Sequence, residues 1–99
     1  MAELPSEVLA RHRDEVLAAA GRHGIQNVRV FGSVARGEDS AGADVDLLVT
    51  IPDSASPWAL ARFQMEVEEI LAVPVDVVED TGAAPSEVLE RARREAVPL

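Results

Sequence analysis

The 99-residue chain contains no cysteine, no tyrosine and no lysine, and only 3% of its residues are aromatic. Without cysteine it has neither disulfides nor thiolate metal ligands, which is typical of proteins in a reducing compartment. It also lacks the roughly 20 consecutive apolar residues of a membrane span, and its charged N-terminal segment has no signal-peptide core. We therefore expect a cytoplasmic protein with no membrane partner and, from its length, a single domain over residues 1–99.

Positive charge is scarce as well. The nine basic residues, all arginine, stand against 18 acidic ones, which gives a formal net charge of −9. Binding to nucleic acid depends on neutralising phosphates, so we expect no direct nucleic-acid partner. An acidic surface instead favours bound cations or a basic protein partner. The apolar faces of the predicted helices leave both a homo-oligomer and a hetero-oligomer open.

Hydrophobic periodicity predicts an α/β (α+β) fold in which a small mixed β-sheet is packed with helices. Ser6 is the expected N-cap of the first helix, and Ser56 followed by Pro57 indicates the start of another. The predicted elements, in chain order, are a helix at 5–22, a strand at 27–32, a short helical run at 33–36, a strand at 44–51, a helix from 57 to about 71, a strand at 74–79, a loop at 81–84 and a helix at 86–96.

Two carboxylates open the second predicted strand, in the sequence Asp44-Val45-Asp46. Residues two apart on a strand point to the same side, so the two aspartates project together while Val45 points toward the core. Adjacent carboxylates repel each other, and a divalent cation relieves that repulsion. Mg²⁺ binds one or two carboxylates together with phosphate oxygens and water. The pair therefore predicts a metal–triphosphate site.

A glycine-serine turn follows the first predicted strand. Gly32 lets the backbone approach a ligand closely and adopt unusual dihedral angles. Backbone N–H groups at the start of the short helical run attract phosphate, and the Ser33 hydroxyl adds a donor. Arg36, one turn further on, is placed to reach a phosphate with its guanidinium group. These three residues are the predicted nucleotide-binding residues.

A third carboxylate lies in the next predicted strand, where Asp76 is flanked by Val75 and Val77. An aspartate in a β-branched run lowers strand propensity, which points to a function. If this strand pairs beside the one that carries Asp44 and Asp46, Asp76 completes a set of three metal-binding and catalytic carboxylates. Such a set suits in-line nucleotidyl displacement with two metal ions, and Asp76 is best placed to accept the proton of the attacking hydroxyl.

Taken together, these residues resemble the signature of the polymerase-β-like nucleotidyltransferase superfamily. In particular the chain is similar to the minimal nucleotidyltransferases (MNT), which are the antitoxins of HEPN/MNT toxin–antitoxin pairs. The signature consists of Gly-Ser, ten residues and Asp-x-Asp, and it is matched by Gly32-Ser33, residues 34–43 and Asp44-Val45-Asp46. Asp76 matches the acidic residue that members commonly carry on a later strand. One departure is Ala43, where many members have serine.

The resemblance implies a reaction. The hydroxyl of an acceptor attacks the α-phosphorus of a nucleoside triphosphate, usually ATP, with one or two Mg²⁺ ions, and pyrophosphate leaves. In the antitoxin branch the acceptor is a tyrosine of the cognate HEPN ribonuclease toxin, which AMP attachment silences. Two alternatives stay open: a non-catalytic module that neutralises the toxin by contact, and a transferase for a small molecule such as an aminoglycoside.

Overall fold

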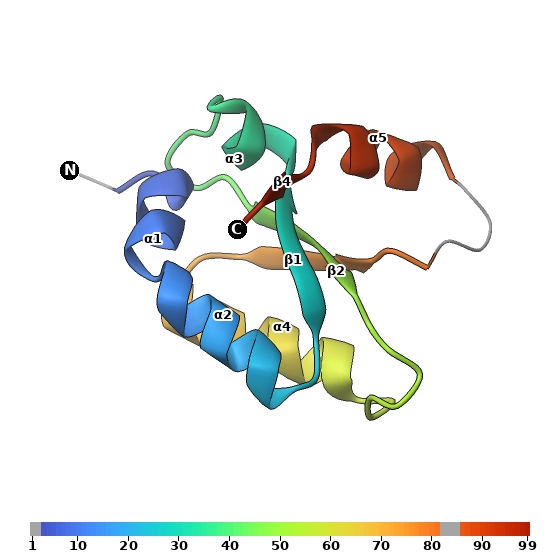
Figure 1. Cartoon of the computed structure of the whole chain (residues 1–99). Helices are drawn as coiled ribbons and strands as arrows, with labels where there is room; N and C mark the ends of the chain where they lie inside the picture. Colours follow the sequence, from blue (N-terminus) through green and yellow to red (C-terminus); the bar gives the residue numbers. More distant parts are fainter. Residues whose placement is uncertain (1–2, 82–85) are drawn as a thin grey trace.

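The computed structural model describes residues 3–81 and 86–99. Helices and strands follow the predicted order, with one additional strand at the C-terminal end (Figure 1). The elements are α1 (Pro5–Arg11), α2 (Arg13–Arg22), β1 (Gln26–Phe31), α3 (Gly32–Arg36), β2 (Val45–Thr50), α4 (Ala59–Leu71), β3 (Val75–Glu79), α5 (Glu87–Glu95) and β4 (Val97–Pro98).

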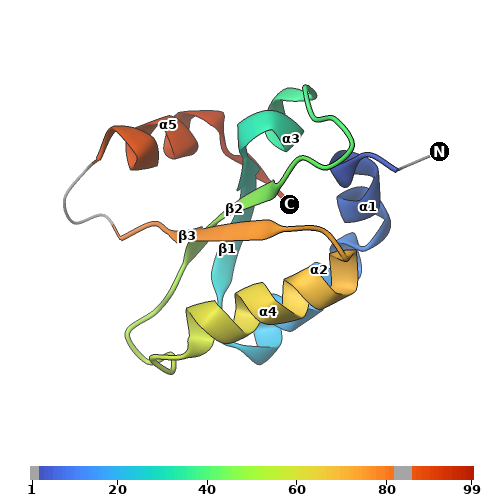
Figure 2. The ribbon, with the colours of Figure 1, turned by 180° about the vertical axis from the view of Figure 1, so that it is seen from behind.

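Four strands form one sheet in the order β3-β2-β1-β4. The central strand β1 is antiparallel to both β2 and β4, whereas β2 and β3 are parallel. A parallel pair needs a crossover connection, and α4 supplies it between β2 and β3 (Figure 2). The sheet is therefore mixed, and the predicted fold class is confirmed.

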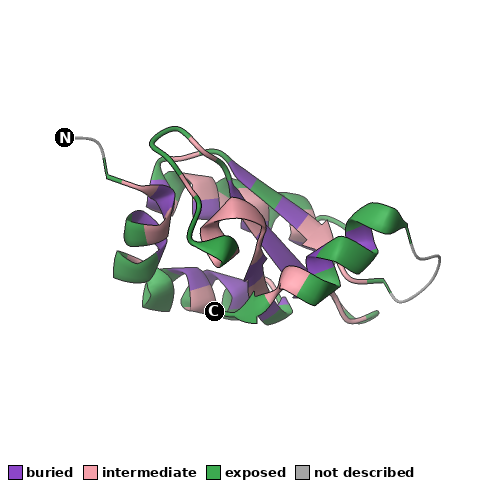
Figure 3. Cartoon of the chain, turned by 90° about the horizontal axis from the view of Figure 1, so that it is seen from above, coloured by how far each residue is buried: buried purple, intermediate pink, exposed green. Residues whose placement is uncertain are grey.

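The larger hydrophobic core lies between the sheet and the helices α1, α2 and α4. Val45, Leu47 and Val49, at alternate positions of β2, are fully buried there, as their spacing predicts. Val28 and Val30 extend this face onto β1, and Phe63 packs against it from α4. Figure 3 shows the buried residues on the strands and on the inward faces of the helices.

A smaller core lies on the opposite face of the sheet, under α5. Leu48 points to this side from β2 and packs with Leu89 and Ala92 of the helix. Phe31 and Val78 flank them on the neighbouring strands. The face of the sheet that carries Leu48 is also the face of Asp46, two residues earlier. Helix α5 therefore shares its side of the sheet with the predicted site.

A small ionic network fastens α5 to the sheet. Asp80, which follows β3, accepts a hydrogen bond from Nε of Arg93 on α5 at 2.8 Å. Its other oxygen accepts one from Nη1 of Arg29 on β1 at 3.3 Å. These hydrogen bonds, from Arg93 first, hold the pKa of Asp80 below its ordinary value of 3.8.

We expect Asp80→Asn to lower the free energy of unfolding at pH 7 by about 1–3 kcal/mol, because it weakens the pairing of the half-buried Arg29. Since the folded-state pKa is lowered, this contribution is present above pH 3.8 and is lost as the pH falls through the lowered pKa. Urea unfolding at several pH values measures the difference. Asp53→Asn, at an exposed loop position, is the control, and an equal loss in that variant would contradict the assignment.

The predicted first helix is wrong in two details. It is divided at His12, whose φ of −106° and ψ of 16° separate α1 from α2. Helix α1 packs near α3, whereas α2 packs against α4. Leu4, rather than Ser6, is the N-cap, and the Ser6 N–H donates to the Asp39 carboxylate at 2.8 Å.

Two further features, the start of one helix and the presence of one strand, differ from the sequence prediction. Helix α4 begins at Ala59 with Trp58 as N-cap, because the Ser56 hydroxyl accepts from the Trp58 N–H within a preceding turn. Strand β4 was not predicted, since two residues carry no periodicity. The predicted loop at 81–84 lies, except for residue 81, outside the described residues. No helix in the described part of the chain is both long and apolar enough to cross a membrane.

Candidate active site

The register of β2 and β3 brings two of the predicted carboxylates together. In this parallel pair Asp46 stands directly beside Asp76, and neighbouring strands lie about 4.8 Å apart. Asp44 precedes β2 by one residue and is exposed. The condition set by the sequence, that the third carboxylate lie on the adjacent strand, is thus met by the fold.

Asp46 is the most enclosed of the three aspartates. Burial, followed by the negative charges of Asp76 and Asp44, raises its pKa above the ordinary value of 3.8. Glu95 adds to the repulsion, and the positive charge of Arg36 partly offsets it. The charged form of Asp46 is therefore held at an electrostatic cost, which a bound cation would remove.

Gly32 lies directly against Asp46. Its predecessor Phe31 is the antiparallel partner of Asp46, so the turn into α3 passes over the carboxylate. Gly32 has a φ of +75°, and a Cβ built there would overlap Oδ2 of Asp46. The positive φ strains any side chain at this position, and a Cβ would also require the Asp46 carboxylate to move. The sequence predicted a close approach of this backbone to a ligand; within the chain itself, the backbone at Gly32 closely approaches the Asp46 carboxylate.

Arg36 ends α3 and is paired with two carboxylates. Its Nε donates to Glu38 at 2.9 Å, and its Nη1 donates to Glu95 at 2.8 Å. The same Glu95 oxygen accepts the backbone N–H of Gly32 at 3.2 Å. Ser33, next to Gly32 in α3, is half-buried. The structure therefore gathers Gly32, Arg36, Asp46 and Asp76 at one end of the sheet.

Glu95 is the residue of this site that sequence reasoning missed. It is the last residue of α5, and the strand pairing of β4 with β1 returns the chain to the side of α3. One signal was available: an acidic residue in the last turn of a helix opposes the helix dipole. Arginines at 93 and 94 suit that position, whereas Glu95 indicates a partner outside the helix.

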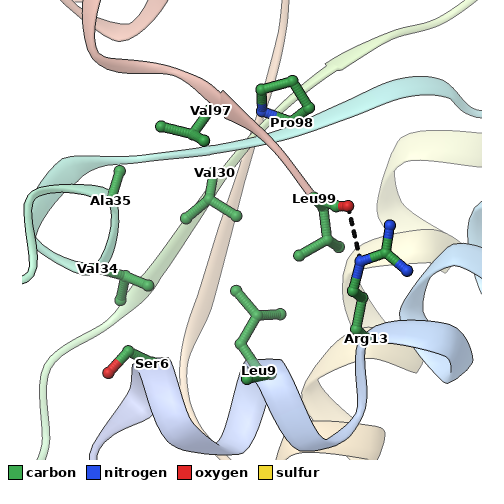
Figure 4. Close-up of a pocket in the computed structure, with 10 residues that line it drawn as sticks. Ser6, Leu9, Arg13, Val30, Val34, Ala35, Val97, Pro98 and Leu99 are labelled. Carbon is green, nitrogen blue, oxygen red and sulfur yellow. Dashed lines mark hydrogen bonds between the residues drawn. The ribbon is translucent and has the colours of Figure 1, made fainter.

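A separate apolar cleft of about 370 Å³ lies between α1, α3 and the C-terminal strand (Figure 4). Leu9, Val34 and Leu99 point into it, and Arg13 closes one side by donating from Nε to the Leu99 carbonyl at 2.9 Å. None of Asp44, Asp46 and Asp76 lines this cleft. The carboxylate site and the cleft share only helix α3.

A family model described as nucleotidyltransferase domain matches residues 9–97. The chain belongs to this nucleotidyltransferase family. It is 32% identical over 71 residues to the protein adenylyltransferase MntA of Thermococcus cleftensis. The matched region covers 72% of this chain and 69% of the relative. The resemblance inferred from the Gly-Ser and Asp-x-Asp spacing is confirmed.

Solved structures are similar to this nucleotidyltransferase over most of its length. One, described as "putative minimal nucleotidyltransferase", has a TM-score of 0.81 and 42% identity, and the match covers 100% of this chain and 97% of the other. An MNT antitoxin solved with the tri-AMPylated HEPN toxin of Shewanella oneidensis has a TM-score of 0.65. At 15% identity, over 90% of this chain and 69% of that one, the second likeness concerns the fold alone.

The donor chemistry of the nucleotidyltransferase site suits Mg²⁺, which prefers carboxylate oxygens. The mutual repulsion around Asp46 and the close backbone at Gly32 fit a site made for a cation and its phosphate ligand. Among residues 3–81 and 86–99, no three acidic or histidine side chains already stand in a metal-holding arrangement.

Proposed function

We propose that this nucleotidyltransferase is a protein adenylyltransferase antitoxin, which transfers AMP from ATP to a tyrosine of a cognate HEPN-type toxin. The observation that carries the proposal is the register that sets Asp46 beside Asp76 and under Gly32. The Thermococcus cleftensis relative is named a protein adenylyltransferase, which supports AMP as the group that is transferred. The fold shared with an MNT antitoxin in a HEPN complex supports the partner.

In the proposed reaction, the tyrosine oxygen forms a bond to the α-phosphorus of ATP. The bond between that phosphorus and the bridging oxygen to the β-phosphate breaks, and pyrophosphate leaves. Asp76, at the exposed edge strand, is the residue proposed to accept the tyrosine proton. Gly32, Ser33 and Arg36 are proposed to hold phosphate oxygens.

Asp44, Asp46 and Asp76 would hold one or two Mg²⁺ ions, which supply charge stabilisation at the phosphorus when bound. Asp46 is held by the strand between Phe31 and Asp76, so its direction is fixed by backbone pairing on both sides. Asp44 precedes the strand and is exposed.

The test combines the purified chain, Mg²⁺, a HEPN-type protein from a neighbouring gene, and ATP labelled at either the α- or the γ-phosphate. We expect label on the HEPN protein from α-labelled ATP only, because adenylyl transfer retains the α-phosphate. Asp46→Asn serves as the inactive control. Neutralisation of the toxin without any transfer of label would overturn the enzyme proposal in favour of inhibition by contact.

A further inference from the structure

Glu95 holds a position that its own helix does not favour. As the last residue of α5 it lies at the negative end of the helix dipole. Its carboxylate nevertheless accepts two hydrogen bonds from α3, from the Gly32 N–H at 3.2 Å and from Nη1 of Arg36 at 2.8 Å. Its side chain is only 22% exposed. These contacts to another element keep the carboxylate in the site.

The two donors that Glu95 occupies are those expected to bind the phosphates of a nucleotide. A carboxylate and a phosphate oxygen accept the same hydrogen bonds from backbone amides and guanidinium groups. With Glu38 on Nε and Glu95 on Nη1, Arg36 faces a carboxylate on both sides. A bound phosphate group would have to replace Glu95 at Gly32 and share Arg36.

Glu95 also adds a negative charge to the end of the sheet that holds three aspartates. This charge repels an incoming triphosphate, and Glu95 also occupies the Gly32 and Arg36 donors that the triphosphate would use. Moving Glu95 away relieves both effects, and the short link between α5 and the two-residue strand β4 is where such a movement would occur.

We propose that Glu95 is an internal competitor for the phosphate-binding donors, so that nucleotide binding and release of Glu95 from Gly32 and Arg36 are one exchange. This inference rests on the proposed function, because it takes the ligand to be a nucleoside triphosphate. When a side chain of the protein occupies the site, only the fraction of molecules with an open site can bind ligand. The apparent affinity is then the affinity of the open site multiplied by that fraction. Glu95 therefore lowers the affinity for ATP and prevents tight retention of phosphate-containing products.

The test is equilibrium binding of ATP to the full chain by calorimetry, with Mg²⁺ and without any acceptor protein. We expect Glu95→Gln to bind ATP about five- to thirtyfold more tightly, because a neutral amide competes less well for the same donors. Adenosine, which has no phosphate, is expected to bind both proteins equally. A Gly32 amide NMR signal that shifts in the nucleotide-free variant would report the lost contact directly.

Two matched variants separate competition from charge. Glu87→Gln removes the same charge from the first turn of α5, and Glu38→Gln removes the other partner of Arg36 while Gly32 stays engaged. Equal tightening in either would overturn the inference. Unchanged ATP binding by Glu95→Gln would also overturn the inference. Weaker ATP binding would overturn it too, because it would mean that Glu95 helps the site to bind ATP.

The outcome also distinguishes this inference from the proposed function. If the wild-type chain and all variants fail to bind ATP, the proposed function fails. If wild type and Glu95→Gln bind ATP equally, only the competitor role fails. Should Glu95→Gln not fold, as judged by thermal melting, Glu95→Asp keeps the charge but shortens the reach, and we expect it to tighten binding in the same direction.

Discussion

The Asp46→Asn variant is expected to lose AMP transfer by about a thousandfold or more and to be at least as stable as the wild type. The loss follows from the position of Asp46 between Phe31 and Asp76, where its oxygen is the most enclosed of the three carboxylates. An asparagine keeps the shape but gives up the negative charge that attracts a cation, which is worth several kcal/mol in the transition state. Transfer of α-labelled phosphate measures the effect.

The stability of this variant has a defined pH dependence. The pKa of Asp46 is raised in the folded state by burial and by the neighbouring aspartates. A raised pKa means that ionisation opposes folding, so any stability from the protonated form is lost as the pH rises through the folded pKa. At pH 7 and without metal, Asp46→Asn is expected to gain about 0.5–2 kcal/mol, and the gain should disappear in acid.

The control for Asp46→Asn is Asp53→Asn, which removes the same charge from an exposed loop. It should leave both transfer and stability unchanged. Added Mg²⁺ with ATP should raise the melting temperature of the wild type and of Asp53→Asn more than that of Asp46→Asn. Wild-type transfer by Asp46→Asn would remove this residue from the mechanism.

Gly32→Ala is expected to have the second large effect. The added Cβ overlaps Oδ2 of Asp46, and the alanine has to adopt a φ of +75°. The backbone conformation and the overlap together should lower the free energy of unfolding by about 2–5 kcal/mol. Because the carboxylate and the turn both have to shift, transfer should fall by about a hundredfold even in molecules that stay folded.

Gly37→Ala provides a close control for that prediction. Gly37 also has a positive φ, +72°, yet nothing lies within 4 Å of a Cβ built there. It therefore measures the backbone penalty alone, about 1–2 kcal/mol, with transfer retained. Chemical denaturation and a transfer assay on both variants give the two quantities. Equal effects in the two variants would show that contact with Asp46 has no part in the role of Gly32.

Much of the fold was predictable because the apolar residues of most helices and strands recur with the period of that element. The alternation in β2 placed Val45, Leu47 and Val49 in the core and Asp46 on the other face, as the structure has them. Helix boundaries were less predictable. The apolar residues on both sides of His12 fit one helical period, so the sequence predicted a single helix, whereas in the structure α1 packs near α3 and α2 packs against α4.

The sequence by itself determined the family, through the spacing from Gly32-Ser33 to Asp44 and Asp46, and the face of β2 on which Asp46 lies. These follow from residues close together in the chain, whose relative directions are set by backbone geometry. Tertiary structure decided the rest. The register of β2 with β3 put Asp76 beside Asp46, and the pairing of β4 with β1 carried Glu95 to Gly32. Both depend on hydrogen bonds between distant segments, which no local period encodes.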